Sequence, residues 1–288
     1  MLGIIGGSGL YDLPGMELVD RVLPDTPYGF PSDEIIIGRT EGRDLAFLSR
    51  HGRGHRLTPT ELPYQANIYA LKQIGVTRVV TISAVGSLRE ALPPRTAVLP
   101  DQIIDRTVSR PRSFFGEGSV AHVGLAEPFC PQLSGQVVAA SVAADRPVAQ
   151  GGTYICVEGP QFSTRAESQL YRSWGGAVIG MTAMPEARLA REAELCYATL
   201  AMVTDFDVWH ETEADVSVDV VQANHDANLE TAQAILQVLA STDLGERTCG
   251  CGNALQGAIV TDPAVIPPPT RRKLGIIADR YLPPMEHR

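Results

Sequence analysis

The sequence predicts an α/β fold, because apolar, strand-like runs alternate with segments of helical periodicity along most of its 288 residues. Hydrophobic residues make up 44% and charged residues 20%, which is ordinary for a globular chain and sufficient for a buried core. Polar side chains directly follow several predicted strands, and open α/β sheets bind ligands at such strand ends. We expect one domain over residues 1–261, followed by an extended, proline-rich C-terminal arm over residues 262–288.

The net charge of the chain disfavours recognition of some classes of binding partner, above all polyanions such as nucleic acids and anionic membranes. The net charge is −9, from 24 basic and 33 acidic residues, and the sequence contains no dense run of Lys or Arg. A nucleic-acid-binding or anionic-membrane-binding surface is therefore not expected. The N-terminus has no basic segment before its short apolar run, and no apolar run reaches the length of a membrane span. These features predict a cytoplasmic protein.

The first half of the chain contains five predicted strands and one predicted helix. The helix covers residues 63–74 and stops at Gly75, and the strands cover residues 2–5, 34–39, 44–49, 77–85 and 96–105. Gly6, Gly7, Ser8 and Gly9 follow the first strand. Glycines free the backbone to bring N–H groups close to an anion, so this segment is either a phosphate loop or a simple strand-to-helix turn.

The second half continues the alternation. The predicted strands cover residues 152–157, 177–181 and 197–204, and the predicted helices cover residues 132–144, 185–194, 218–239 and a segment that reaches Trp174. Ser163 is the expected N-cap of that last segment. Phe162, just before it, is either a hydrophobic staple or an exposed stacking platform.

The stretch from Leu200 to Trp209 ends an apolar run in two carboxylates, Asp205 and Asp207. In an extended strand these two side chains lie on one face and Phe206 points to the other. A desolvated, protonated carboxyl group can donate a proton while an ionised partner accepts hydrogen bonds, so the pair suits acid catalysis. The alternative is that both residues are solvated at a strand end.

Polar groups at other strand ends suit an oxyanion. Arg50 offers a planar fork of donors and His51 a donor that can be charged, although a solvated basic loop is the alternative. Ser83 and Ala84 end another strand, and Thr182 follows a third. His122 lies in a long loop, where an isolated histidine is more often structural than catalytic.

Five scattered cysteines do not form the pattern of a secreted disulfide framework. Cys249 and Cys251 are close in sequence, but no second pair of ligands lies nearby, so free thiols are favoured over zinc or a local redox pair.

Taken together, eight motifs resemble the purine nucleoside phosphorylase and methylthioadenosine phosphorylase family. They follow the family's order from Gly3 to about residue 240: Gly3-Ile-Ile-Gly-Gly-Ser-Gly-Leu10, Ser49-Arg-His-Gly-Arg-Gly-His55, Tyr64-Gln-Ala-Asn67, Ser83-Ala-Val-Gly-Ser87, Glu127-Pro-Phe-Cys130, Glu158-Gly-Pro-Gln-Phe-Ser163, Gly180-Met-Thr-Ala-Met-Pro-Glu186 and Thr204-Asp-Phe-Asp-Val-Trp209. The Cys249-Gly-Cys251 segment also resembles a Cys-x-Cys of thermophilic relatives, where disulfides occur.

The resemblance implies a phosphorylase/hydrolase-like, three-layer α/β/α domain with a central mixed sheet. It implies phosphorolysis of 5′-methylthioadenosine to adenine and 5-methylthio-α-D-ribose 1-phosphate by a homotrimer or a dimer of trimers. Phosphate is a co-substrate, and neither a metal nor an organic cofactor is expected. The roles that it implies are phosphate contacts for Ser8, Arg50, His51, Ser83, Ala84 and Thr182, substrate contacts for Met181, Phe162, Asp205, Phe206, Asp207 and, from a neighbouring subunit, His122, and specificity positions for Ser163 and Val218.

Within the implied site, Asp205 matches the acid at purine N7 and Asp207 the acceptor for the 6-amino group. Several alternatives remain open. They are a phosphorylase of other adenine nucleosides, a 6-oxopurine nucleoside phosphorylase, a nucleosidase that uses water in place of phosphate, and a non-catalytic nucleotide-binding protein. The phosphate-binding set argues against the nucleosidase, and the two acids argue against the non-catalytic protein.

Overall fold

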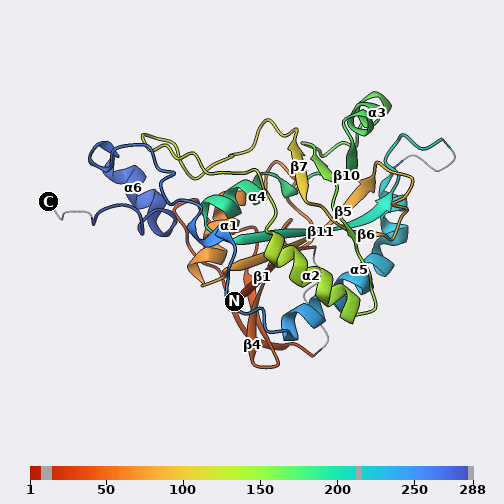
Figure 1. The fold of residues 1–288 in the computed structure, drawn as a ribbon, viewed down its shortest axis with the longest axis horizontal. Helices are drawn as coiled ribbons and strands as arrows, with labels where there is room; N and C mark the ends of the chain where they lie inside the picture. Colours follow the sequence, from red (N-terminus) through yellow and green to blue (C-terminus); the bar gives the residue numbers. More distant parts are fainter. Residues whose placement is uncertain (8–14, 212–215, 285–288) are drawn as a thin grey trace.

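The computed structural model of the chain describes residues 1–7, 15–211 and 216–284 (Figure 1). Eleven strands in this part of the chain form one sheet. They are β1 (Leu2–Gly6), β2 (Glu17–Val22), β3 (Ile35–Thr40), β4 (Arg43–Ser49), β5 (Arg78–Ser87), β6 (Ala97–Leu99), β7 (Gln102–Asp105), β8 (Ala149–Gln150), β9 (Thr153–Cys156), β10 (Gly176–Gly180) and β11 (Cys196–Asp205).

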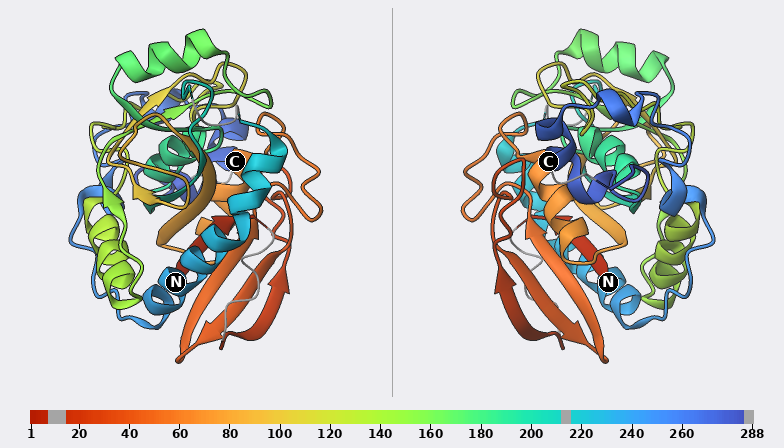
Figure 2. Two further views of the ribbon diagram at one scale, coloured as in Figure 1. Left: turned by 90° about the vertical axis from the view of Figure 1, so that its right-hand side faces the viewer. Right: turned by 90° about the vertical axis from the view of Figure 1, so that its left-hand side faces the viewer.

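The sheet is mixed and branches at β5. Its main path has the order β2-β3-β4-β1-β5-β10-β9-β7, while β11 pairs with the other edge of β5 and continues to β6 and β8. Strands β4, β1, β5 and β11 are parallel, and β10 is antiparallel to β5. Figure 2 shows β2, β3 and β4 at the edge of the molecule farthest from α3.

Helices cover both faces of the sheet. They are α1 (Tyr64–Gln73), α2 (Pro131–Ala143), α3 (Arg165–Ser173), α4 (Ala183–Glu192), α5 (Val218–Ser241) and α6 (Pro268–Leu274). Ile5 of β1 packs in the core cluster that contains α1 and α4, whereas its neighbour Ile4 packs in the cluster that contains α2 and α5. This alternation is the period of a strand buried on both faces. It confirms the predicted three-layer α/β/α architecture.

Local signals explain where several helices begin. Cys130 caps α2, with Pro131 at the first helical position. Thr164 caps α3 and forms a capping box with Glu167. The prediction that Ser163 is this cap is wrong by one residue, because only Thr164 has Glu167 three positions later. Phe162 therefore does not occupy the staple position next to the cap.

Proline sets two other boundaries, and one of them differs from the prediction. The single strand expected over residues 96–105 is two strands, β6 and β7, because Pro100 between them cannot donate a ladder hydrogen bond. In α4 the regular helix begins at Pro185 as expected, after a Met184 backbone with φ −116° and ψ 137°.

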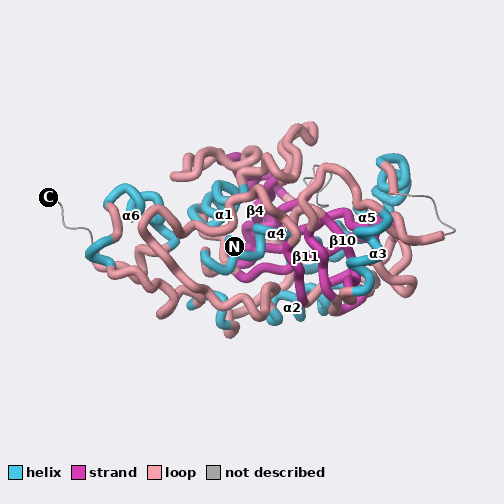
Figure 3. Tube along the Cα trace, turned by 90° about the horizontal axis from the view of Figure 1, so that it is seen from above, coloured by secondary structure: helices cyan, strands magenta, loops and turns pink. Residues whose placement is uncertain are grey.

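The C-terminal segment folds back onto the domain. Residues 263–277 contain α6 and two short 3₁₀ helices, so this part is not extended as predicted. Leu274 and Ile277 are buried in the cluster that contains α1 and α4. Ile259 pairs with Ala121 of the long loop between β7 and α2, and α6 lies at the opposite end of the molecule from α3 (Figures 1 and 3).

Among the helices in the described ranges, none combines the length and the apolar character that a membrane span requires.

Candidate active site

A stretch of β5 lacks a strand partner on one edge. Residues Arg78–Thr81 pair with β1, pairing with β10 involves Gly86 and Ser87, and the described residues place no strand beside Ile82–Val85 on that edge. Ala84 is exposed and Ser83 is partly exposed, although β5 is central in the sheet. We call this stretch the β5 opening. The C-terminal ends of β1, β4 and β11 lie at the same end of the sheet, because these strands run parallel to β5.

Asp205 ends β11 beside this opening. Its carboxylate accepts hydrogen bonds of 2.7 Å from the Thr204 hydroxyl and from the Asp207 backbone N–H. The side chain is buried, and this burial raises its pKa although both hydrogen bonds lower it. A carboxyl group with a raised pKa is suited to hold and donate a proton.

Asp207 is also buried, but the strand does not place it. The strand ends at Asp205, and Asp207 has φ +53°, which is in the left-handed region. The prediction that strand alternation aligns the two acids is therefore wrong, and a turn brings them together instead. Asp207 Oδ2 has no hydrogen-bond partner. Burial raises the pKa of Asp207 to about 6, although the Ser168 hydroxyl lowers it and the charge of Asp205 adds to the rise, so the group is mostly ionised at neutral pH.

Gly86 makes this arrangement of the acids possible. A Cβ atom on Gly86 would lie 2.9 Å from Asp205 Oδ1, 3.1 Å from Ile179 Cγ2 and 3.3 Å from Asp207 Cβ. The register between β5 and β11 also shifts at Asp205, which pairs with Gly86. The absence of a side chain at Gly86 therefore lets β10 and both acids approach β5 closely.

Arg50 follows β4 and is buried within the sheet. Its Nε donates to Glu186 Oε1 at 2.7 Å and its Nη2 to Glu186 Oε2 at 3.3 Å. The Ile82 carbonyl accepts from Nη1 at 2.9 Å, which places the guanidinium beside Ser83. The fork that was expected to bind phosphate thus binds a carboxylate. Four bonds, including one to the Ile5 carbonyl, use four of the five N–H groups and leave one Nη1 hydrogen for a ligand.

His51 is neutral at neutral pH. Burial lowers the pKa of its imidazole to about 4. Its Nδ1 lies 2.8 Å from the Leu57 carbonyl and must donate there, so Nε2 is an acceptor. The ring stacks on His55 with centroids 4.2 Å apart. The expectation of a charged donor at this position is wrong, and His51 is suited to accept from a hydroxyl or a protonated phosphate.

Two hydroxyl groups complete the arrangement around Arg50. Ser83 Oγ is buried without a hydrogen-bond partner. Thr182 is buried at the N-cap position of α4, yet its side chain makes no capping hydrogen bond. Thr182 lies close to β5 because β10, which precedes it, runs antiparallel to β5 and ends at Gly180 beside Val85. A Cβ atom on Gly180 would lie 3.0 Å from Val85 Cγ1. The Ser83 and Thr182 hydroxyl groups are therefore suited to donate to an anion.

Arg110 organises this region but was not identified from the sequence. It is buried and donates to the carbonyls of Met181 and Met184, which connects the long loop after β7 to the end of β10. It also pairs with Glu158, which follows β9, at 3.1 Å. The sequence contained no signal for this role, because the partners of Arg110, two backbone carbonyls and the Glu158 carboxylate, lie far along the chain.

The remaining predicted residues occupy different surroundings. Phe206 is buried and stacks on His210, with centroids 4.6 Å apart. Phe162 is 43% and Val218 73% exposed, and Val218 begins α5, which is held to the end of β11 through Asn224. His122 donates its backbone N–H to the Ala258 carbonyl in the C-terminal segment. Ser8 lies outside the described residues.

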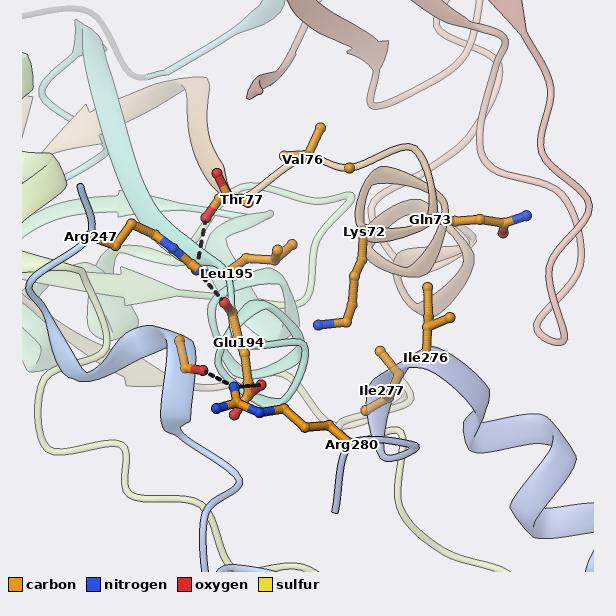
Figure 4. Close-up of a pocket in the computed structure, with 12 residues that line it drawn as sticks. Lys72, Gln73, Val76, Thr77, Glu194, Leu195, Arg247, Ile276, Ile277 and Arg280 are labelled. Carbon is orange, nitrogen blue, oxygen red and sulfur yellow. Dashed lines mark hydrogen bonds and ion pairs between the residues drawn. The ribbon is translucent and has the colours of Figure 1, made fainter. Parts of the chain in front are cut away.

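The described part of the chain has a pocket of ≈350 Å³ at the other end of β11, lined by residues that include Leu195, Gly252 and Arg280 (Figure 4). The basic side chains that line this pocket already donate to backbone carbonyls. Lys72 donates to Ala193, Arg247 donates to Glu194, and Arg280 donates to Gly252. A second pocket, of ≈430 Å³, is lined by Trp209 and His210 and adjoins the acidic end of β11. Neither pocket is lined by Arg50, Ser83 or Asp205, which lie at the β5 opening.

A family model described as the phosphorylase superfamily matches residues 1–241, which include every strand above and both acids. The chain belongs to the phosphorylase superfamily. This phosphorylase is 51% identical to the S-methyl-5′-thioadenosine phosphorylase of Geobacter sulfurreducens, over 98% of this chain and 99% of the relative. It is 52% identical to that of Koribacter versatilis, over 97% and 96% of the two chains.

Solved structures place this phosphorylase in the same group. A methylthioadenosine phosphorylase from an antarctic soil metagenomic library superposes with a TM-score of 0.90 at 48% identity, covering 96% of this chain and 98% of the other. A methylthioadenosine phosphorylase from Schistosoma mansoni in complex with adenine gives a TM-score of 0.80 at 35% identity, covering 83% and 90%.

Proposed function

We propose that the protein catalyses phosphorolysis of 5′-methylthioadenosine to adenine and 5-methylthio-α-D-ribose 1-phosphate, and thus acts as a pentosyltransferase of purine and methionine salvage. The observation that carries this proposal is the position of the two buried acids beside the β5 opening, close to the phosphate-binding candidates on neighbouring strands. The near-full-length similarity to S-methyl-5′-thioadenosine phosphorylases supports the choice of substrate.

In the proposed reaction, a phosphate oxygen forms a bond to C1′ of the sugar while the bond from C1′ to purine N9 breaks. The electron pair of that bond enters the purine, and Asp205 transfers its proton to N7. The raised pKa of Asp205 makes it a better proton donor at neutral pH than a solvated aspartate. The free Oδ2 of Asp207 accepts a hydrogen bond from the 6-amino group.

Phosphate binding is assigned to Arg50, His51, Ser83, Ala84 and Thr182, with Ser8 as a further candidate. The remaining Nη1 hydrogen of Arg50 and the hydroxyl groups of Ser83 and Thr182 are donors, and His51 Nε2 is an acceptor. Met181, Phe162 and Phe206 are assigned to the nucleoside, and Ser163 and Val218 to its specificity. The reaction needs neither a metal nor an organic cofactor, because phosphate and Asp205 provide the nucleophile and the acid.

The assay that tests this function measures base release from 5′-methylthioadenosine, adenosine and inosine, each with and without phosphate. We expect phosphate-dependent release of adenine, fastest from 5′-methylthioadenosine. Full activity without phosphate would identify a nucleosidase. Preference for inosine would identify a 6-oxopurine phosphorylase, and no turnover of any nucleoside would leave only a binding function.

We further propose that the enzyme is a cytoplasmic homotrimer or dimer of trimers. The support is the position of His122, whose loop packs on the C-terminal segment through the pairing of Ala121 with Ile259. A neighbouring subunit is needed if His122 is to reach a substrate. Light scattering tests this assembly, and a fully active monomer would contradict it.

A further inference from the structure

Four cysteines that are distant in sequence lie together in the fold. The Sγ atoms of Cys130, Cys196, Cys249 and Cys251 all lie within 4.8 Å of one another. The sulfur atoms of Cys196 and Cys249 are 3.4 Å apart, far longer than a disulfide bond of about 2.05 Å. All four are free thiols, and only Cys249 is not buried. We call this group the four-cysteine cluster.

Three separate elements supply these thiols. Cys130 caps α2, Cys196 is the first residue of β11, and Cys249 and Cys251 lie at the start of a 3₁₀ helix, η2 (Gly250–Asn253). The second pair of ligands that is missing near Cys249 in the sequence is therefore present in space. Sequence spacing could not identify it, because Cys130 and Cys196 come from different layers of the fold.

From this geometry we infer that the four-cysteine cluster is a structural zinc site. Zinc binds four thiolates tetrahedrally at about 2.3 Å, which places the sulfurs about 3.8 Å apart. The observed separations require only small side-chain adjustments to reach that value. Four protein thiolates leave no open coordination position, so the metal would have a structural role and not a catalytic one.

The surroundings of the cluster suit the charge of such a site. Four thiolates and one Zn²⁺ carry a net charge of −2, which is costly to bury without compensating donors. Arg191 Nη1 lies 3.5 Å from Cys251 Sγ, and the Leu133 N–H donates to Cys130 Sγ at 3.4 Å in the first turn of α2. Donors to ligating sulfurs orient the ligands and stabilise the metal-bound form.

The site would fasten the C-terminal segment to the core. Gln132 Oε1 accepts from the N–H groups of Thr248 and Cys249, at 2.9 Å and 3.1 Å, and so already positions this segment. Gly252 and Leu195, the neighbours of two of the cysteines, line the pocket in Figure 4, where Arg280 also binds the Gly252 carbonyl. The cluster and Asp205 lie at opposite ends of β11, about 30 Å apart at 3.3 Å per residue, so the inference does not depend on the proposed reaction.

The first test is metal analysis of the full-length protein, purified with a reducing agent and without chelator. We expect one zinc ion per chain by plasma mass spectrometry. The Cys249→Ser variant should lose most of this zinc, because Cys249 is the least buried ligand. Cys156→Ser is the matched control, since Cys156 is buried outside the cluster, and it should retain the metal. Equal zinc in both variants, or iron in place of zinc, would overturn the assignment.

A second measurement keeps the inference testable if the Cys249→Ser variant does not fold. Wild-type protein stripped of metal and reconstituted with Co²⁺ should show the visible d–d bands and sulfur-to-metal charge transfer of a tetrahedral cobalt thiolate. In denaturant with chelator, all five cysteines should titrate as thiols. A count reduced by two or four would show disulfides within the cluster, and no binding of Zn²⁺ or Co²⁺ by fully reduced wild type would equally overturn the proposal.

Discussion

The guanidinium of Arg50 and the carboxylate of Glu186 form a buried ion pair, with Nε and Oε1 2.7 Å apart and both side chains at most 3% exposed. This pair ties the end of β4 to α4, next to the β5 opening. Arg50 therefore stabilises the fold in addition to its proposed contact with phosphate. A substitution of Arg50 is expected to change both stability and phosphate binding.

Glu186→Gln should destabilise the protein strongly, because it leaves the charge of Arg50 buried without a counter-charge. Removing one partner of a buried pair typically costs about 3–5 kcal/mol. The free energy of unfolding in urea measures this loss. Asp44→Asn is the matched control, since it breaks the exposed ion pair with Arg39 and should change stability little. Similar losses in the two variants would contradict the structural role of the buried pair.

Asp205→Ala should lower kcat for every purine nucleoside by about 10²–10⁴-fold, because it removes the general acid. Folding and adenine binding should be largely retained. Thr204→Val is a milder comparison, since it deletes only the hydroxyl that donates to Asp205 at 2.7 Å. A kcat for Asp205→Ala within a few-fold of the wild-type value would exclude it as the acid.

The ionised carboxylate of Asp207 should determine which purine base the enzyme prefers and how its activity depends on pH. Protonation occupies the acceptor that the 6-amino group requires, so kcat/KM for 5′-methylthioadenosine should fall as the pH is lowered through about 6. Asp207→Asn should abolish this acidic limb and shift preference towards 6-oxopurines, which need a donor. The wild type should discriminate by a factor of about 10⁴, and equal efficiency on 5′-methylthioinosine would refute the assignment.

The same pKa has the opposite effect on the stability of the ligand-free protein. Because the folded pKa is raised from 3.8 to about 6, Asp207 favours folding below pH 3.8, and this contribution is lost as the pH rises through 6. The difference is roughly 3 kcal/mol for a shift of this size. Asp207→Asn should accordingly flatten part of the fall in unfolding free energy between pH 4 and about 6. An unchanged slope would show that Asp207 titrates normally.

Gly86→Ala should displace the acids, since its Cβ atom would lie 2.9 Å from Asp205 Oδ1. Overpacking of this kind costs about 1–3 kcal/mol, and turnover should fall with stability. Gly135→Ala is the control, because Gly135 lies within α2 with open space around it. That substitution should stabilise the protein by about 0.5–1 kcal/mol. Normal turnover in Gly86→Ala would contradict the need for close approach.

The elements of the fold were largely predictable from hydrophobic periodicity and proline or glycine boundaries. The apolar run into Asp205 predicted β11 because a strand buried on both faces must be continuously apolar. The geometry beyond it was not predictable, since the left-handed backbone of Asp207 places its side chain by a turn and not by alternation. The cap of α3 is a different case, because Thr164 and Glu167 have the sequence spacing of a capping box and so indicate the cap that was assigned to Ser163.

The candidate site was predictable as a set of residue types but not as a set of contacts. The motif that contains Arg50 suggested a phosphate ligand, but only the fold shows that Glu186 occupies most of its donors. His51 was expected to be a donor that can be charged, but its burial, which keeps it neutral, is a property of the folded state. Partners that lie far away in sequence leave no local pattern, as Arg110 and the four-cysteine cluster demonstrate.

Strand β11 begins at Cys196, one of the four cysteines, and ends at Asp205, and all ten of its residues are buried. It pairs with β5 along its whole length and with β6 at Ala201 and Met202. Amide hydrogens in such a strand exchange with solvent only when the whole domain opens, whereas loops exchange through local fluctuations. The proposed acid, Asp205, and one cysteine of the four-cysteine cluster, Cys196, are thus held by the part of the chain that opens last.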